Sequence, residues 1–206
     1  MITMLVISGG NIITMGPEGT LQSKQIVVEG ERIQDITEKG MIVENAEHLD
    51  AGGGYILPAF IDAHTHMGLE EEIYRVEGDD VNETTDPVTP QLQAVDGIHF
   101  RDLAFKDALR GGIARAMCMP GSANVIGGQA VFLKTLAADM SSMIYKNPWG
   151  LKAALGENPK RVYGEQQKKA PRTRMASASL LREALYKAAR NLEKDSLDPE
   201  VEYKQM

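Results

Sequence analysis

Segments of strand character alternate with segments of helical periodicity after a glycine-rich break at Gly52–Gly54. This alternation indicates βα units and a sheet of parallel strands. Before the break, the chain shows short β-branched runs that are separated by glycines and turn residues, which is typical of small antiparallel sheets. We therefore predict an α/β fold in two parts: a small N-terminal β-sandwich portion at residues 1–55, and a βα domain at residues 56–206.

The N-terminal part is predicted to hold strands at residues 4–8, 11–14, 25–30 and 32–37, with "EGER" as a tight hairpin connection between the last two. In the second part we predict three strands, at residues 55–66, 113–121 and 150–159, each running into a loop. A helix is expected at residues 96–112. A second helix is expected at residues 176–195, with an apolar stripe made of Leu180, Leu181, Ala184, Leu185, Ala188 and Leu192.

Charge and composition exclude several classes of protein. The net charge is −7 and the sequence pI is about 5.2, which argues against a nucleic-acid binder. Cys118 is the single cysteine, so the chain cannot form an internal disulfide. No apolar run approaches the ~20 residues that a membrane-spanning helix needs, and the N-terminus lacks the basic region of a signal peptide. We expect a cytoplasmic protein that binds neither membrane nor nucleic acid.

The stretch "PAFIDAHTHMG" places two of the four histidines at the end of a strand. Side chains two apart on a strand point to the same face, so Asp62, His64 and His66 share one side. Active sites of parallel barrels lie at the carboxyl ends of the strands. The two imidazoles are therefore candidate metal ligands, with structural histidines as the alternative. Asp62 is a candidate acceptor that orients a ring from beneath.

The segment "FIDAHTH", after a small β region, resembles the first barrel strand of the amidohydrolase superfamily. The later segments "GSANVIGGQ", "LGENPKRVYG" and "TRM…LLREALYKA" resemble a bacterial branch close to imidazolonepropionase. One departure is Ala59, where the family usually has glycine. The resemblance implies a metal-dependent hydrolase on a TIM-type (β/α) barrel, with one or two divalent ions, zinc first. It also implies that His64 and His66 bind the metal.

The loops after the predicted strands supply further candidates. Glu157 lies where related deacetylases take a carboxylate ligand; an exposed loop glutamate is the alternative. The backbone of Gly127 and Gly128 could approach a small-molecule substrate, in a segment that is otherwise a structural loop. Lys160 and Arg161 could meet a substrate carboxylate, with surface solvation as the alternative. Arg172 and Arg174 could bind an anionic group of the substrate, again with surface solvation as the alternative. The acidic segment at residues 70–91 is a lid candidate, or a mobile loop.

Half of the expected site is missing from the sequence. No histidine follows His99, and only three barrel strands are convincing, whereas a closed barrel takes roughly 250 residues. We therefore expect a partial barrel, whose general-base aspartate would lie beyond residue 206. A complementing chain or a second copy is expected to cover its open edge. The implied activity is hydrolysis of a carbon–nitrogen bond other than a standard peptide bond, in a small cyclic amide first and an N-acyl compound second. The alternative is a non-catalytic fragment that needs a partner chain.

Overall fold

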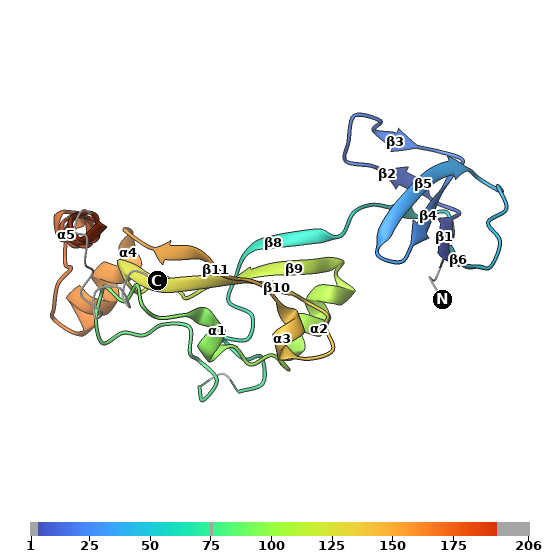
Figure 1. Ribbon diagram of the computed structural model, residues 1–206. Helices are drawn as coiled ribbons and strands as arrows, with labels where there is room; N and C mark the ends of the chain where they lie inside the picture. The colour runs from blue at the N-terminus through green and yellow to red at the C-terminus, as the bar shows by residue number, and fades with distance from the viewer. Residues whose placement is uncertain (1–3, 75, 193–206) are drawn as a thin grey trace. The chain divides into compact units, whose positions relative to one another are not determined.

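The computed structural model describes residues 4–74 and 76–192 of the 206-residue chain. The chain divides into two compact units between Ala59 and Phe60 (Figure 1). Each unit is described by itself below.

The N-terminal unit is built of strands alone within its described residues. They form two sheets, with strand orders β5-β4-β1-β6 and β3-β2-β7. The four predicted strands are present as β1 (Met4–Ser8), β2 (Asn11–Ile13), β4 (Lys24–Glu29) and β5 (Arg32–Glu38). The prediction missed the short or polar strands β3 (Thr20–Leu21) and β6 (Ala46–Asp50). The single strand predicted at residues 55–66 is two strands, of which the first, β7 (Tyr55–Ile56), belongs to this unit.

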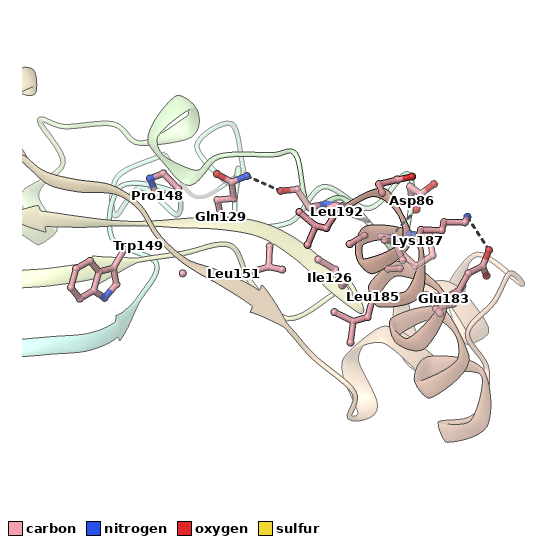
Figure 2. Close-up of a pocket in the computed structure, with 18 residues that line it drawn as sticks. Asp86, Ile126, Gln129, Pro148, Trp149, Leu151, Glu183, Leu185, Lys187 and Leu192 are labelled. Atoms are coloured by element: carbon pink, nitrogen blue, oxygen red, sulfur yellow. Dashed lines mark hydrogen bonds and ion pairs between the residues drawn. The ribbon is translucent and has the colours of Figure 1, made fainter. Parts of the chain in front are cut away.

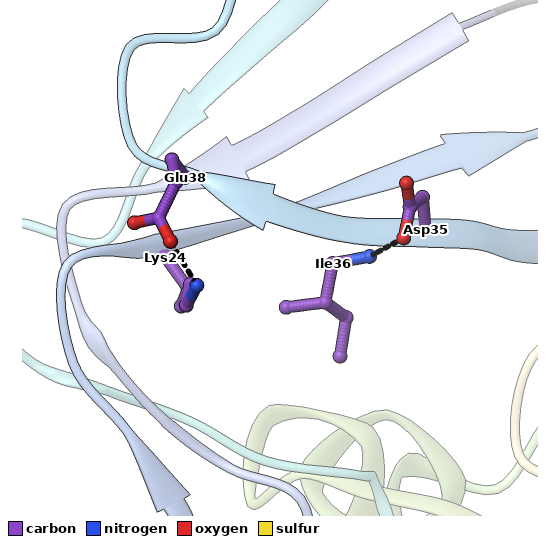
Figure 3. Close-up of polar contacts among 4 residues, drawn as sticks. All are labelled: Lys24, Asp35, Ile36 and Glu38. Atoms are coloured by element: carbon purple, nitrogen blue, oxygen red, sulfur yellow. Dashed lines mark hydrogen bonds and ion pairs between the residues drawn. The ribbon is translucent and has the colours of Figure 1, made fainter.

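The β4–β5 hairpin is fixed at both ends. Glu29 pairs with Arg32, which leaves Gly30 and Glu31 as the two-residue turn that "EGER" predicted. Gly30 has φ +58, a left-handed conformation that favours glycine in such turns. At the other end, Lys24 pairs with Glu38, and their side chains form an ion pair (Figure 3). This register buries Ile26 and Val27 in the small core of the unit.

The second unit is organised around a sheet of four strands in the order β11-β10-β9-β8 (Figure 1). The strands are β8 (Phe60–Thr65), β9 (Ile113–Cys118), β10 (Ile126–Lys134) and β11 (Ile144–Ala153). β8 is parallel to β9, and β10 is antiparallel to both of its neighbours. β8, β9 and β11 therefore run in one direction, as predicted for the three strands. The sheet is nevertheless mixed and not all parallel, because β10 runs in the opposite direction.

The prediction of a loop at residues 121–129 is wrong in its second half, because β10 begins at Ile126. The two glycines that suggested a loop are buried in this strand instead. Gly127 is the extra residue of a bulge against β11, since the pairing shifts between Ile126 and Gly128. Gly128 has φ +126, and a Cβ there would lie 2.8 Å from the carbonyl oxygen of Leu92. The glycines thus allow close backbone packing within the sheet.

Gly128→Ala is expected to destabilise the chain by about 2–4 kcal/mol, because it combines backbone strain with a steric clash. Gly156→Ala is the matched control, since no heavy atom lies within 4 Å of its added Cβ and its φ is negative. Urea unfolding measures both changes. Equal stabilities for the two variants would contradict the close approach at Gly128.

Helices and turns cover one face of this sheet. The predicted helix at residues 96–112 is two helices, α1 (Ala94–Gly97) and α2 (Leu103–Arg110). The break has a physical cause: the Asp102 carboxylate accepts a hydrogen bond from the Ala104 N–H and caps α2. Phe105 of α2 packs with Cys118 of β9 and Leu133 of β10 in the main core, joined by α3 (Met140–Met143). Burial raises the pKa of the Cys118 thiol to about 12.

A short helix, a π-helix and a long helix follow β11. They are α4 (Glu157–Pro159), η1 (Lys160–Gln166) and α5 (Arg174–Leu192). The predicted end of the last helix, at residue 195, lies outside the described residues. The apolar stripe predicted on α5 is only partly covered: Leu185 is 57% exposed and Leu192 is 75% exposed (Figure 2), whereas its other four residues are half-buried. No helix in the described parts of the chain is long and apolar enough to cross a membrane.

Candidate functional site

The two histidines of "HTH" lie at the carboxyl end of β8, with their ring centroids 5.5 Å apart and their planes at 84°. The Nδ1 atom of His66 lies 2.7 Å from the carbonyl oxygen of Met119, just after β9. Because a carbonyl can only accept, this contact assigns the proton to Nδ1. The lone pair on Nε2 is then available, which is the arrangement that metal-binding histidines adopt.

Lys152 joins the histidines from β11, which is separated from β8 by two strands of the sheet. Its Nζ atom lies 3.2 Å from Nε2 of His64. The pKa of His64 is lowered, first by the charge of Lys152, then by burial and by His66, while Asp62 opposes the shift. Burial also lowers the pKa of Lys152 itself. Sequence reasoning missed this lysine, although it lies near the start of the strand predicted at residues 150–159; no local signal links it to a residue 88 positions away. The observed strand β11 begins and ends earlier than predicted, so Lys152 lies near its carboxyl end.

Asp62 lies beside His64 but contacts its backbone. The Oδ1 atom of Asp62 accepts a hydrogen bond of 3.0 Å from the His64 N–H. Asp62 was predicted to orient a histidine ring, but in the described structure no carboxylate does so. The ring of His66 is oriented by the Met119 carbonyl instead. Asp62 instead fixes the backbone where the strand ends.

Gly127 lies beside this cluster. A Cβ on Gly127 would be 3.6 Å from the Lys152 side chain and 3.6 Å from Pro120. Gly128 packs against Leu92 instead. Of the two glycines predicted to approach a substrate, Gly127 thus lies next to the Lys152 side chain, which contacts His64.

The candidates after β11 form a separate polar cluster. Glu157 is 85% exposed and makes a 2.8 Å ion pair with Lys160, whose hydrogen bond and charge lower the pKa of the carboxyl. Arg174 adds to this shift. Arg161 donates to Asn158, which in turn donates to Ser122 in the loop after β9. Within residues 4–74 and 76–192, no three His, Cys, Asp or Glu side chains are grouped closely enough to hold a metal, so Glu157 does not join the histidine pair.

The second half of the predicted lid is tied down by side chains from the neighbouring loops. Asn124, which is 2% exposed, donates to the carbonyl oxygens of Glu83 and Asp86. The hydroxyl of Tyr163, in the π-helix, donates to the same Asp86 carbonyl at 2.9 Å. Gln167 donates to the Thr84 carbonyl. The segments that follow β8, β9 and β11 are thus hydrogen-bonded to one another.

Tyr163→Phe is expected to cost about 1 kcal/mol of stability at neutral pH, the value of one net hydrogen bond. Burial and the charges of Asp86 and Glu83 raise the pKa of Tyr163 to about 12. The unfolded chain releases this proton near pH 10, so the folded state holds more protons between pH 10 and 12 and loses stability as pH rises through that window. Between pH 10 and 12, the free energy of unfolding of the Tyr163→Phe variant should therefore fall less steeply with pH than that of the wild type, as measured by chemical denaturation. The half-exposed Tyr145→Phe is the control, and an identical pH dependence in both variants would refute the assignment.

A scan against models of known protein families finds no match. Among curated proteins, the chain is 31% identical to the amidohydrolase tasK of Hapsidospora irregularis over 159 residues, which is 72% of this chain and 16% of that protein. It is 36% identical over 78 residues to the imidazolonepropionase of Picrophilus torridus, covering 34% of this chain and 19% of the relative.

Among solved structures, an amidohydrolase from Thermotoga maritima superposes with a TM-score of 0.86 at 34% identity. The match covers 98% of this chain and 55% of the Thermotoga chain. The chain therefore spans about half of this relative and smaller shares of the two curated ones. By sequence and by fold, the chain is related to the N-terminal portion of proteins of the amidohydrolase superfamily.

Proposed function

We propose that this chain is the N-terminal portion of a metal-dependent amidohydrolase, which cleaves a carbon–nitrogen bond other than a standard peptide bond. The observation that carries the proposal is the His64–His66 pair at the end of β8, with Nδ1 of His66 on a backbone carbonyl. The likeness to the Thermotoga amidohydrolase along almost the whole chain supports it. In this proposal, residues 56–206 form the first part of a (β/α) barrel.

The residues present fit a divalent metal in part. Nε2 of His66 has the correct tautomer to bind it, and Nε2 of His64 becomes available once Lys152 moves away. Zinc is the proposed ion, because neutral imidazole is one of its usual ligands. A bound zinc would lower the pKa of a water molecule toward neutrality and polarise the substrate carbonyl.

The roles of the chain's own groups follow from their positions. His64 and His66 hold the ion, and Asp62 fixes the strand end from which they project. The Gly127 backbone and Lys152 form the wall next to His64, where a substrate oxygen would meet a donor. A small cyclic amide is the proposed substrate class, and an N-acyl compound is the second. Lys160 and Arg161 stay the proposed contacts for a substrate carboxylate, at the end of the sheet from which the loops emerge.

A second candidate is a non-catalytic fragment that requires a partner chain. It is favoured by the incomplete ligand set, since the described residues gather two imidazoles and no third metal ligand. The single, buried Cys118 supports the proposal that either form acts in the cytoplasm, where thiols stay reduced.

Zinc titration separates the two candidates when it is combined with a complementing segment. The N-terminal chain is mixed with the part of the Thermotoga amidohydrolase that lies outside the match, and hydrolysis of cyclic amides and N-acyl compounds is followed with and without zinc. The enzyme proposal expects zinc-dependent turnover that His66→Ala abolishes. A complex that binds zinc through His64 and His66 but hydrolyses neither class would favour the non-catalytic reading.

A further inference from the structure

Strand β8 is irregular just before the histidine pair. In its parallel pairing with β9, Asp62 lies opposite Ala116 and Thr65 lies opposite Cys118. β8 therefore advances by three residues where β9 advances by two, so β8 holds one extra residue between Asp62 and Thr65. An extra residue of this kind is a β-bulge, and bulges re-aim side chains next to active sites.

The bulge changes which face of the sheet the residues of β8 point to. Residues that lie opposite each other on neighbouring strands point to the same face. Ala116 and Cys118 are both 0% exposed and belong to the main core on the helix side of the sheet. Asp62 and Thr65 therefore both face this core, although residues three apart on a regular strand point to opposite faces. The prediction that Asp62 shares a face with the two histidines is thus wrong.

The thiol of Cys118 gives independent support for this placement of Asp62. Burial first, and then the charge of Asp62, raise the pKa of Cys118 to about 12. A carboxylate acts on the thiol in this way when it lies on the same side of the sheet.

The orientation of the histidines depends on the bulge. Because Thr65 points into the core, His64 and His66 on either side of it point to the opposite face. There, Nε2 of His64 lies 3.2 Å from Nζ of Lys152. Regular pairing onward from Asp62 would instead place His64 opposite Cys118, with its imidazole in the core. A shift of one residue in register moves a whole set of side chains to the other face.

Asp62 itself closes the bulge. The extra residue interrupts the ladder of backbone hydrogen bonds between the two strands. The His64 N–H donates to Oδ1 of Asp62 at 3.0 Å, so a side chain supplies the acceptor at this point. Aspartate and asparagine both make this local bond to a backbone N–H two residues further along the chain.

We propose that Asp62 is a positioning residue for the metal site: from the core side of β8, it holds the bulge that turns His64 and His66 to the opposite face. The assignment of a metal to this pair rests on the proposed function, whereas the bulge does not. Asp62 acts through the backbone of His64, and within the described residues it makes no hydrogen bond to either ring. An acceptor oxygen is therefore required at position 62, and a negative charge is not.

Hydrogen exchange of the His64 amide in the full chain, followed by NMR, tests the bulge without any metal. Asp62→Ala should speed this exchange about tenfold, since it removes one hydrogen bond, whereas Asp62→Asn should leave it slow. Asp35→Ala is the matched control, because Oδ1 of Asp35 accepts the Ile36 N–H beside a register shift in β5 (Figure 3). Unchanged His64 exchange in Asp62→Ala would overturn the proposal. Faster exchange throughout β10 as well would overturn it too, because the effect would then be a general loss of stability.

Zinc affinity, measured by competition with a chromophoric chelator, tests the positioning role. Asp62→Ala should weaken zinc binding at least about tenfold, as other groups that orient metal ligands do. Asp62→Asn and Asp35→Ala should keep the affinity of the wild type. An equal loss in Asp62→Asn and Asp62→Ala would show that the charge matters and would overturn the proposal.

Two further outcomes separate this proposal from the proposed function. Wild-type zinc affinity in Asp62→Ala would overturn the positioning role and leave the proposed function intact. Zinc binding that survives in the His64→Ala, His66→Ala double variant would overturn the proposed metal site, and the exchange of the His64 amide would still decide whether Asp62 holds the bulge.

Discussion

Replacing either histidine of the pair by alanine is expected to abolish tight metal binding in any assembled form of the barrel. Loss of a partner outside the ligand shell already costs 10–100-fold in metal affinity, so loss of a ligand should cost more than about 100-fold. His66→Ala should have the larger effect, because the Nδ1 contact with the Met119 carbonyl orients its ring for binding. His64 must first lose its contact with Lys152.

Elemental analysis after gel filtration measures this effect. His48→Ala and His99→Ala are the matched controls, because these histidines lie in β6 and between α1 and α2. They should keep the metal content of the wild type. Full metal occupancy in the His64→Ala, His66→Ala double variant would remove the ligand assignment altogether.

The 206-residue chain alone is expected to show no measurable amidohydrolase turnover, even when it is saturated with zinc. Its described residues bring no third His, Cys, Asp or Glu to the histidine pair. The carboxylate of Asp62, two residues before His64, already accepts the His64 N–H. By resemblance, the base that takes the proton from water lies on a later barrel strand. General acid–base catalysis is worth 10²–10⁴-fold, and metal activation adds to it, so losing both steps should leave no detectable rate.

Hydrolysis of a set of cyclic amides and N-acyl compounds by the pure chain checks this expectation. A rate that disappears on chelation and in His66→Ala would contradict it, and would show that the chain carries its own base. A rate that survives chelation would instead identify a contaminating enzyme. The Asp62→Asn variant should have no effect on either outcome.

The sequence predicted the parts of the fold that depend on short-range patterns. Strand β8 and its histidines follow from a buried run that ends in "HTH", and the β4–β5 turn follows from "EGER". β10 was missed because glycines at 127 and 128 break the strand pattern. Those glycines are there for close packing on Leu92 and beside Lys152, which only the folded chain reveals.

The placement of the two candidate ligands on one face was predictable from the sequence, and the groups around them were not. His64 and His66 are two residues apart, so strand periodicity alone puts them on one face. The Met119 carbonyl and Lys152 reach them from β9 and β11, across 53 and 88 residues of sequence. The Tyr163 hydroxyl meets its carbonyl acceptor across 77 residues. Contacts of this kind depend on strand order and direction, and the antiparallel β10 was outside the predicted topology.

The most direct test of the metal-site assignment is a crystal structure of the zinc-loaded chain, with anomalous diffraction data at the zinc edge. The account predicts one anomalous peak at about 2.0–2.1 Å from Nε2 of both His64 and His66. Nδ1 of His66 should still contact the Met119 carbonyl, and Lys152 should be displaced from His64. A peak elsewhere in the chain, with His64 still bonded to Lys152, would contradict the central claim that this strand end is a metal site.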